Sequence, residues 1–345
     1  MSAIREALHK VTKKNDLTAD EASGAMDEIL DGATEQGLVG ALLVALRMKG
    51  ETVDEIVGCA RSMRRHATRV SVAKFDDVAL VDTCGTGGDS AGTFNISTVA
   101  AIVVAGAGVP VAKHGNRSIS SRCGSADLLE ALGVQVILNP EQVARSIEEV
   151  GIGFMFAPCF HPAMKQVQPI RTQLRLRTIF NILGPLTNPA GAEAQVVGVF
   201  SERLVPQIAE VLATLGVRRA FVVHGDDGLD EITTTTGTTI AEVRDGKMTS
   251  GKITSTDFGV PEALSEDLRG GDSDTNRVIV EEVLAGISGP QRDIVVVNAS
   301  ASLVAAGKVE DFKEGVEVAA RSIDSGEAAN RLRHLAEFTT NIAGQ

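Results

Sequence analysis

The stretch Val81–Gly133, VDTCGTGGDSAGTFNISTVAAIVVAGAGVPVAKHGNRSISSRCGSADLLEALG, decides the fold. Its first residue ends a short apolar run, Val78–Val81, which predicts a buried strand. The run leads into the glycine-rich loop Gly85–Asp89, and an apolar helix is predicted from Ile96 to Ala107. A strand followed by a glycine-rich loop and a buried helix is typical of proteins that bind small anionic ligands.

A second strand and loop follow this helix. Val109–Ala112 is apolar, and the polar loop Lys113–Ser118 comes directly after it. Strand, loop, helix, strand and loop is the order of a parallel βαβ sheet, in which ligand-binding loops gather at the carboxyl ends of the strands. The stretch therefore predicts an α/β fold with a mostly parallel central sheet and two ligand-binding loops at one edge.

Both loops carry groups suited to an oxyanion. Glycines let backbone N–H groups approach a phosphate closely, and the N-terminus of the following helix favours negative charge. Polar and cationic side chains surround these glycines: Thr93, Asn95, Ser97, Thr98, Lys113 and Arg117. Two familiar phosphate motifs do not fit, because the dinucleotide fingerprint needs a glycine where Ser90 stands and the P-loop needs a lysine after Gly92. We therefore expect an anionic ligand of another class.

The segments GTGGD, TFNIST, KHGNRS and CGSADLLEALG, in this order and spacing, resemble the anthranilate phosphoribosyltransferase family of tryptophan biosynthesis. The similarity covers most of the chain and is densest from Asp82 to Pro189. It implies a small N-terminal helical domain and a larger α/β domain, as in nucleoside phosphorylases and phosphoribosyltransferases. It also implies transfer of the phosphoribosyl group of 5-phosphoribosyl 1-pyrophosphate (PRPP) to the amine of anthranilate, with release of pyrophosphate, a pair of Mg²⁺ ions in each subunit, and a homodimer formed through the helical domain.

The composition excludes some functions. A formal net charge of −12 argues against nucleic-acid or anionic-membrane partners, because both need a basic surface. The segment 111–180 nevertheless holds eight Lys/Arg against five Asp/Glu, which suits an anionic substrate in a cleft. The cysteines form no CxxC pair, charged residues interrupt the N-terminal sequence before any signal-like run, and no apolar stretch is long enough for a bilayer. We expect a cytoplasmic protein.

The beginning of the chain predicts helices only. Thr18 and Thr52 each precede a glutamate by three residues, which is the capping-box pattern of a helix N-terminus. From Val78 onward, apolar strands alternate with amphipathic helices. We therefore place a helical domain at residues 1–72, joined in one alternative by part of 163–190, and an α/β catalytic domain at 73–345. A basic run is interpreted as a solvated face or a linker approach: Arg61, Arg64, Arg65 and Arg69.

Further elements are predicted after the two loops. The predicted helices span 125–132, 140–150, 164–178 with a break at Pro169, and 203–215. The predicted strands span 134–138, 153–157, 195–200, 220–223 and 294–298, with a further αβ unit at 232–243. The order of the strands in the sheet does not follow from these patterns.

The segment His161–Thr178 offers three guanidinium groups, on Arg171, Arg175 and Arg177. A guanidinium fork matches a planar carboxylate such as that of anthranilate. We interpret Arg175 and Arg177 as a solvated helix face, and His161 as a packed or hydrogen-bonding residue rather than a base. The resemblance assigns anthranilate to Arg171, because FHPAM, PIR and RTIFNILGPLTNP match the family. The family usually has glycine in place of Arg175, so this arginine adds a charge toward the site or toward solvent.

The segment His224–Glu231 carries four carboxylates after a predicted strand. Hard oxygen ligands beside a phosphate site suit Mg²⁺. Asp226 and Asp227 are interpreted as an exposed acidic turn. For Asp230 and Glu231 the resemblance, through DGLDE, favours a metal site.

The predicted site has three groups of residues. PRPP is assigned to Gly85, Gly88, Asp89, Thr93, Asn95, Ile96, Ser97, Thr98, Lys113, His114, Gly115, Asn116, Arg117, Ser118, Ile119, Ser120, Ser121 and Ser125. Anthranilate is assigned to Gly85, Asn116 and Arg171, and Mg²⁺ to Ser97, Asp230 and Glu231. Asp89 is anionic, so we expect it to contact the ribose or metal-bound water. No residue is assigned as a general acid or base, because an aromatic amine is mostly neutral at pH 7.

Two alternatives stay open. A pyrimidine-nucleoside phosphorylase has a similar architecture but binds phosphate and a nucleoside, and KHGNRS and DGLDE favour the transferase over it. A non-catalytic nucleic-acid-binding relative of the same fold would need a basic surface, which the net charge of −12 disfavours.

Overall fold

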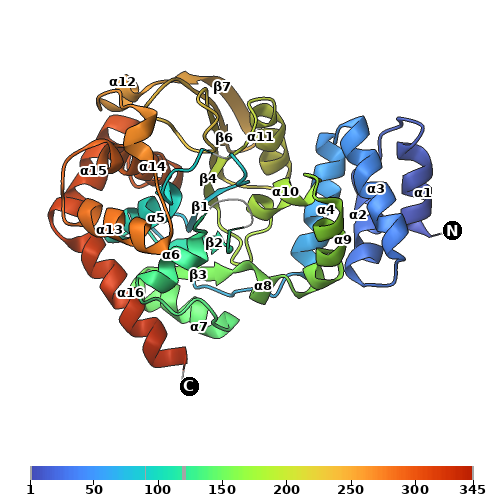
Figure 1. Cartoon of the computed structure of the whole chain (residues 1–345), viewed down its shortest axis with the longest axis horizontal. Coiled ribbons are helices and arrows are strands. Elements are labelled where there is room, and N and C mark those ends of the chain that lie inside the picture. Colours follow the sequence, from blue (N-terminus) through green and yellow to red (C-terminus); the bar gives the residue numbers. More distant parts are fainter. Residues whose placement is uncertain (1, 90, 119–121, 344–345) are drawn as a thin grey trace.

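The computed structural model describes residues 2–89, 91–118 and 122–343. A seven-stranded sheet in the order β3-β2-β1-β4-β5-β6-β7 forms the centre of the larger part of the molecule (Figure 1). The strands are β1 (Val81–Gly85), β2 (Val111–Gly115), β3 (Ile152–Phe156), β4 (Ala194–Gly198), β5 (Arg219–Gly225), β6 (Thr238–Arg244) and β7 (Lys247–Ile253). Neighbours from β3 to β5 are parallel, whereas β5–β6 and β6–β7 are antiparallel. The expected α/β fold with a mostly parallel sheet is confirmed.

Helices form a bundle beside the sheet and cover both of its faces (Figure 1). The bundle contains α1 (Ala3–Val11), α2 (Ala19–Leu30), α3 (Gln36–Lys49) and α4 (Val53–His66). The middle of the chain adds α8 (Ala157–Phe160), a 3₁₀ turn (Pro162–Gln166), α9 (Gln168–Leu174), α10 (Phe180–Leu183) and a second 3₁₀ turn (Gly184–Leu186). The other helices are α5 (Ile96–Gly106), α6 (Ser125–Ala131), α7 (Pro140–Arg145) with a π turn (Ser146–Val150), α11 (Leu204–Thr214), α12 (Ser255–Phe258), a 3₁₀ turn (Ser265–Leu268), α13 (Ser273–Leu284), α14 (Pro290–Ala306), α15 (Phe312–Asp324) and α16 (Glu327–Ala343).

Both predicted capping boxes are present in the bundle. The N–H of Glu21 donates to Thr18 Oγ1 and the N–H of Glu55 donates to Thr52 Oγ1, each at 3.3 Å. Each glutamate in turn accepts the N–H of its threonine. These bonds satisfy backbone groups that the first turn of a helix leaves without partners, so the predicted starts of α2 and α4 are confirmed.

The sheet separates two apolar cores. On β5, Phe221 and Val223 face a core with α5, α14 and α16, whereas Ala220 and Val222 face α11. This alternation is the period-two pattern of a strand that is buried on both faces. The core on the α11 side continues without interruption into the helical bundle. The bundle and the sheet therefore share one apolar cluster.

Two arginines of the bundle reach backbone carbonyls of the middle segment. Arg64 Nε donates to the carbonyl oxygen of Leu186 at 2.7 Å, and Arg47 donates to that of Arg177. Burial lowers the pKa of Arg64, so its interpretation as a solvated residue is wrong. Exposed Arg61 and Arg69 and the Arg65 ion pair with Asp27 at 2.6 Å match the expectation of a solvated face.

Part of the segment 163–190 packs on the bundle. Val167 and Ile170 are buried in the core of the bundle, and α9 lies against α3. The division at residues 72 and 73 stays a proposal, as does the addition of this segment to the helical domain.

Several predicted elements are corrected. The segment 134–138 alternates buried and exposed residues but is not a strand, and Ile294–Asn298 lies inside α14. A short apolar run cannot distinguish a buried strand from a fully buried helix, and α14 is apolar along its middle because the core surrounds it. The predicted break near Pro169 is present, because a 3₁₀ turn ends at Gln166 and α9 begins at Gln168 with Pro169 in its first turn, where proline fits.

The first two strands begin later than predicted. β1 begins at Val81 and β2 at Val111, so Gly85 and Lys113–Gly115, which were predicted to lie in loops, belong to strands. Asp82 and Lys113 are tolerated there because each has a buried hydrogen-bond partner, as described below. Along the described residues, no helix is long and apolar enough to cross a membrane.

The antiparallel hairpin of β6 and β7 was not predicted. Its turn is Asp245-Gly246, with φ angles of 50° and 75°. Positive φ at both central residues is the geometry of a type I′ turn, for which Asp-Gly is a preferred sequence. This dipeptide was therefore the signal that could have identified the hairpin.

Candidate active site

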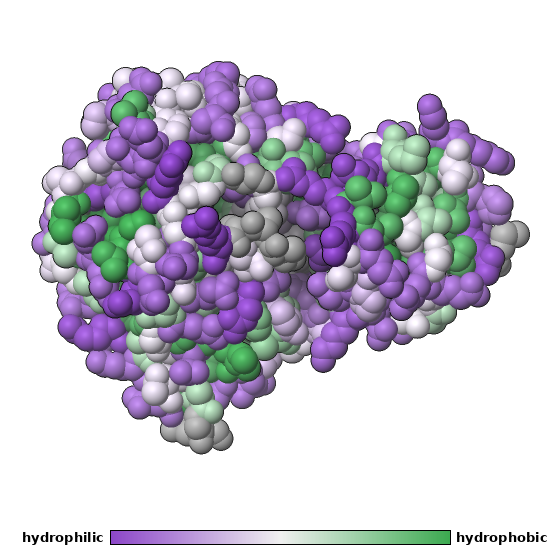
Figure 2. Space-filling model, viewed as in Figure 1, coloured by the Kyte–Doolittle hydropathy of each residue, from purple (hydrophilic) through white to green (hydrophobic). Residues whose placement is uncertain are grey.

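The strand order brings the predicted loops to one edge of the sheet. β1 lies between β2 and β4, and β5 is the next strand. Because these strands are parallel, the segments after Gly85, Gly115 and Gly225 all leave at the same edge (Figure 1). On the face seen in Figure 2, the surface is hollowed between the larger part and the helical bundle.

Asp230 and Glu231 hold the glycine-rich loop and the start of α5. Asp230 Oδ2 accepts the N–H of Gly87 at 2.7 Å, and Glu231 Oε1 accepts the N–H of Ser97 at 3.1 Å. Burial, together with the charge of Asp89, raises the pKa of Asp230 to about 7. Burial, together with the charge of Asp230, raises the pKa of Glu231 to about 8. Burial and the neighbouring carboxylates thus disfavour the charged forms of these groups, although the charge of Lys113 opposes the shift of Glu231, and a further cation would stabilise them.

The donor set fits Mg²⁺ that is completed by a substrate. Within the described ranges, no group of three or more His, Cys, Asp or Glu side chains is arranged to hold a metal ion alone. Mg²⁺ takes one or two protein carboxylates and keeps waters or phosphate oxygens as its other ligands. Asp230 and Glu231 can supply such carboxylates, and the half-buried Ser97 lies next to Glu231.

Close packing explains two glycines at this edge. A Cβ on Gly198 would lie 1.5 Å from the carbonyl oxygen of Asp230, and one on Gly85 would lie 2.5 Å from its carboxylate. Only glycine lets the backbone of Asp230 approach β1 and β4 so closely. Gly198 was not identified from the sequence, because a glycine at the end of a strand usually marks only a turn.

Lys113 lies in a layer beneath the loops. Its side chain is buried, and Nζ donates to the carbonyl oxygen of Thr83 at 2.6 Å. Burial lowers its pKa, while the charge of the buried Asp82 opposes that change. Asp82 also accepts from Asn188 Nδ2 at 2.7 Å and from the N–H of His114 at 3.2 Å. The predicted contact between Lys113 and pyrophosphate stays a prediction.

The second loop is tied to the helix that follows it. Arg117 Nη1 lies 2.8 Å from Asp127 and 2.6 Å from Glu130. Asp127 also accepts the N–H of Gly124 at 2.9 Å, and Ser125 Oγ accepts the N–H of Asn116 at 3.2 Å. The guanidinium of Arg117 therefore has protein partners. Ile119, Ser120 and Ser121, which are assigned to PRPP, lie outside the described residues.

Asn95 joins the segment after the first loop to the segment after the second. Its Nδ2 donates to the carbonyl oxygen of Cys123 at 3.1 Å, and its Oδ1 accepts from Asn276 Nδ2 at 3.0 Å. Asn276 is buried on α13 and also accepts the N–H of Gly271 at 2.7 Å. Asn276 was missed because nothing in its local sequence marks it. The assignment of Asn95 to PRPP stays a prediction.

The remaining residues that are assigned to PRPP differ in how far they are buried. Ile96 and Thr98 are buried, and their backbone N–H groups donate to the carbonyl oxygens of Phe94 and Asn95 at 2.9 and 3.0 Å, so their assignment to PRPP stays a prediction. Thr93 is half-buried and pairs with Arg269 across an isolated antiparallel bridge. Gly88 and Gly115 are half-buried as well.

The arginines of the middle segment differ in their surroundings. Arg171 is half-buried, burial lowers its pKa, and its Cζ lies 5.9 Å from the centre of the Phe180 ring. Arg175 is exposed and ends α9 with a left-handed φ of 48°. Glycine is favoured in this conformation, which explains physically why the family usually has glycine here.

Arg177 corrects an interpretation. It is exposed but lies outside the helix, and it donates through Nη2 to the carbonyl oxygen of Gly88. Its Cζ lies 4.3 Å from the centre of the Phe200 ring. Arg177 is therefore a contact of the glycine-rich loop and not part of a solvated helix face.

Two buried histidines lie side by side near the second loop. The rings of His114 and His161 are 5.1 Å apart between their centres. Burial lowers the pKa of His114 to about 3, with a smaller effect of His161, and burial lowers the pKa of His161 to about 4. Among the described residues, neither Nε2 atom has a hydrogen-bond partner. The lowered pKa values favour neutral rings at pH 7, and the burial of His161 agrees with a packed residue.

Asp226 and Asp227 behave as an acidic turn. Asp226 pairs with Lys252 at 2.7 Å, and Asp227 accepts the hydroxyls of Thr233 and Thr235 at 2.6 and 2.5 Å.

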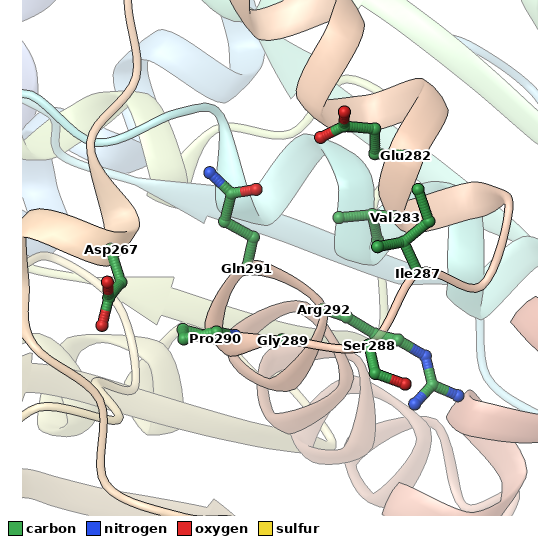
Figure 3. A pocket seen from close by; sticks show the side chains of 9 residues that line it. All are labelled: Asp267, Glu282, Val283, Ile287, Ser288, Gly289, Pro290, Gln291 and Arg292. Atoms are coloured by element: carbon green, nitrogen blue, oxygen red, sulfur yellow. The ribbon is translucent and has the colours of Figure 1, made fainter.

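A separate hollow of about 280 Å³ lies where α13 leads into α14 (Figure 3). None of the predicted substrate residues lines it, and its Arg292 turns away from Gln291 to pair with Asp324 at 2.7 Å.

Known proteins match the whole chain. A model of the glycosyl transferase family, helical bundle domain, matches residues 5–67, and one of the glycosyl transferase family, a/b domain, matches residues 77–329. The anthranilate phosphoribosyltransferase of Solibacter usitatus is 55% identical over 334 residues, which cover 97% of this chain and 98% of that protein.

Solved structures agree with these matches. Anthranilate phosphoribosyltransferase from Thermus thermophilus is 43% identical and superposes with a TM-score of 0.92 over 99% of this chain and 100% of its own. The Saccharomyces cerevisiae enzyme in complex with PRPP and Mg is 28% identical, with a TM-score of 0.89 over 98% of each chain. These relatives support the transferase and not the two alternatives. The chain belongs to the anthranilate phosphoribosyltransferases, the glycosyltransferases of tryptophan biosynthesis that join the phosphoribosyl group of PRPP to the amine of anthranilate.

Proposed function

We propose that the chain carries out this transfer at the edge formed by β1, β2, β4 and β5, with Mg²⁺ between Asp230, Glu231 and the pyrophosphate of PRPP. The observation that supports this most directly is the pair of carboxylates bonded to the glycine-rich loop and to the start of α5. Burial and the neighbouring carboxylates raise the pKa of both groups, so a bound cation would favour their charged forms. A pair of Mg²⁺ ions per subunit, one of them at Ser97, is part of the proposal.

The chemical difficulty of the reaction is charge. Pyrophosphate leaves as the sugar C1 becomes cationic, and bound Mg²⁺ supplies positive charge to the departing oxyanions. The backbone N–H groups of Gly88 and Asp89 are the donors that the glycine-rich loop can offer to the same oxygens. Lys113 supports this edge from beneath with a buried positive charge.

Anthranilate needs a defined orientation. Its amine must face C1 of the ribose, so its carboxylate must be anchored on the other side. Arg171 offers a half-buried guanidinium fork for that carboxylate, and the exposed amide of Asn116 lies on the neighbouring loop. No strong base is needed, because the aromatic amine is already mostly neutral, and the neutral His114 and His161 suit such a site.

A test of the reaction itself is direct. Anthranilate is fluorescent, and a chain without Trp or Tyr adds almost no competing signal. Loss of anthranilate fluorescence that requires both PRPP and Mg²⁺ is expected. No loss, combined with phosphorolysis of thymidine, would support a nucleoside phosphorylase instead.

The anthranilate anchor can be tested separately. Removing a desolvated bidentate contact costs on the order of 2–5 kcal/mol, so Arg171→Ala is expected to raise the anthranilate KM strongly and leave the PRPP KM nearly unchanged. Arg175→Ala is the matched control, because Arg175 is exposed at the end of the same helix. Greater sensitivity at Arg175 would contradict the assignment.

A homodimer through the helical bundle is the proposed assembly, with the cytoplasm as its location. Met48 on α3 is 83% exposed, and Figure 2 shows apolar patches on the bundle. Light scattering on the wild type is expected to give twice the chain mass of 36.1 kDa, and Met48→Glu is expected to lower it. A monomeric wild type would contradict the proposal.

A further inference from the structure

Arg177 connects the helical bundle to the glycine-rich loop. Its guanidinium donates to the carbonyl oxygen of Gly88 and stacks on Phe200, with Cζ 4.3 Å from the ring centre. Its own carbonyl oxygen accepts from Arg47 Nη1 on α3. One residue therefore touches α3, the loop after β1 and the segment after β4.

The backbone around α9 explains how Arg177 arrives there. α9 packs against α3 of the bundle and ends at Leu174. The left-handed Arg175 then turns the chain out of the helix, so that Arg177 no longer shares a helix face with Arg171. The position of Arg177 thus follows the position of the bundle.

The other contacts of the loop come from the α/β part. The N–H of Thr86 donates to the carbonyl oxygen of Gly198 at 2.9 Å, and the N–H of Gly87 donates to Asp230 at 2.7 Å. Gly88 follows, with a φ of 79° that favours glycine. A Cβ on Gly88 would lie only 3.1 Å from Arg177 Nη2, so the guanidinium lies directly against the loop backbone.

Holding the Gly88 carbonyl fixes the direction of the next N–H. In a planar trans peptide, the C=O and the following N–H point in opposite directions. With the carbonyl of Gly88 on Arg177, the N–H of Asp89 faces away from Arg177. The same peptide also places Asp89 near enough to Asp230 for their charges to interact.

We propose that Arg177 is a positioning residue, which orients the Gly88–Asp89 peptide so that the loop after β1 presents its N–H groups to the pyrophosphate of PRPP, and that Arg47 supports it from the helical bundle. This inference rests on the proposed assignment of that loop to PRPP. Arg177 touches no reacting atom in this account. Its effect should therefore fall on PRPP and not on anthranilate.

Steady-state kinetics of four single variants test the proposal. A hydrogen bond with a charged partner contributes more free energy than one between neutral groups. Arg177→Ala should therefore raise the PRPP KM about tenfold and change the anthranilate KM less than about twofold. Arg177→Lys keeps a charged donor but loses the planar stack on Phe200, so an increase of about threefold is expected. Arg175→Ala, an exposed arginine two residues away, should change neither KM. Arg47→Ala should raise the PRPP KM about threefold.

The double variant Arg47→Ala/Arg177→Ala shows whether the two arginines act together. If Arg47 acts through Arg177, its removal should add nothing further once Arg177 is alanine. Equal KM values for Arg177→Ala and Arg175→Ala would overturn the proposal. So would proportional increases in both substrates' KM values with a lowered melting temperature, which would indicate general structural damage.

Hydrogen exchange separates this inference from the proposed function. In the full chain without any ligand, peptides that cover residues 85–95 should exchange faster in Arg177→Ala than in Arg175→Ala, because the loop loses its outer contact. Unchanged exchange in an active enzyme would overturn the role of Arg177 alone. Faster exchange in a protein that does not consume anthranilate would instead retain the contact and reject the assigned reaction.

Discussion

The two loops at the active edge are held in different ways. The loop after β1 receives its hydrogen bonds from segments far away in the chain, namely Asp230, Gly198 and Arg177. Among the described residues, the loop after β2 is bonded to α6, through Asp127 and Glu130, which lie 10 and 13 residues after Arg117. The first loop is thus a product of the tertiary fold, and the second is largely a local structure.

This difference indicates how each loop should respond to substitution. Changes in distant parts of the chain should alter the first loop and its use of PRPP and Mg²⁺. Changes in α6 should alter the second loop and the stability of its own helix. Asn95 is bonded to both Cys123 and Asn276, so a change at Asn95 should affect both loops.

The largest effect is expected for Gly198→Ala. Its Cβ would lie 1.5 Å from the carbonyl oxygen of Asp230, so β4 or the acidic turn must shift. We expect a loss of about 3 kcal/mol in the free energy of unfolding, measured with urea, together with loss of turnover. Gly184→Ala is the control, because no atom of the described residues lies within 4 Å of its added Cβ. Equal stability of both variants would show that the first loop does not depend on this approach.

The double variant Asp230→Asn/Glu231→Gln removes the two carboxylates of the first loop. The Mg²⁺ concentration for half-maximal rate should rise by up to about 100-fold. Without Mg²⁺ the variant should be no less stable than the wild type, because burial raises the pKa of both carboxyl groups and disfavours their charge. Unchanged activity at low Mg²⁺ would contradict the metal site.

Low pH should destabilise the protein through His161, which lies near the second loop. The unfolded chain protonates this histidine near its ordinary pKa of 6.5, whereas burial keeps it neutral in the folded chain down to about 4. Stability is therefore complete above pH 6.5 and decreases as the pH falls toward 4, by on the order of 3 kcal/mol. In thermal melts, His161→Phe should show a weaker decrease over this range. The same change at the exposed His9 should leave the decrease unaltered.

Asp127→Ala tests the local character of the second loop. It removes the acceptor of the Gly124 N–H at the start of α6 and one partner of Arg117. A loss of about 1 kcal/mol in unfolding free energy is expected, with little change in Mg²⁺ dependence. A large change in Mg²⁺ dependence would show that the two loops are not separate.

The smallest expected effect belongs to Arg175→Gly. Glycine adopts the left-handed φ of 48° without a steric cost, so the variant should be more stable by about 0.5–1 kcal/mol. Arg175→Ala should give no such gain, because alanine keeps the cost of that conformation. Lost stability in the glycine variant would mean that the arginine side chain makes a compensating contact.

The general architecture could be predicted because local patterns repeat over many residues. The capping threonines, the buried α5 and the βαβ order all carry their signals within a short segment. The prediction of a strand at Ile294–Asn298 was wrong because this segment carries no such local signal. A buried apolar run has no periodicity that distinguishes a strand from a helix, and only the surrounding core decides between them.

The residues of the site could likewise be predicted only where their local sequence carries a signal. Asp230, Glu231 and the glycines could be named because their types and spacing match a known family. Asn276, Gly198 and Arg177 could not be named, because each acts through a partner in a distant segment of the chain. These partners are Asn95 for Asn276, Asp230 for Gly198 and Gly88 for Arg177. Such contacts depend on strand order, which the sequence patterns left open.

The apolar cluster shared by the bundle and the α11 face of the sheet has a consequence for cooperativity. A boundary of this kind has no solvent layer along which two bodies could separate, so heat should melt the bundle and the sheet in one transition. A chain shortened to begin at residue 73 would expose the apolar side of α11 and should aggregate. The helical bundle should therefore fold and unfold together with the α/β part, and not as an independent domain.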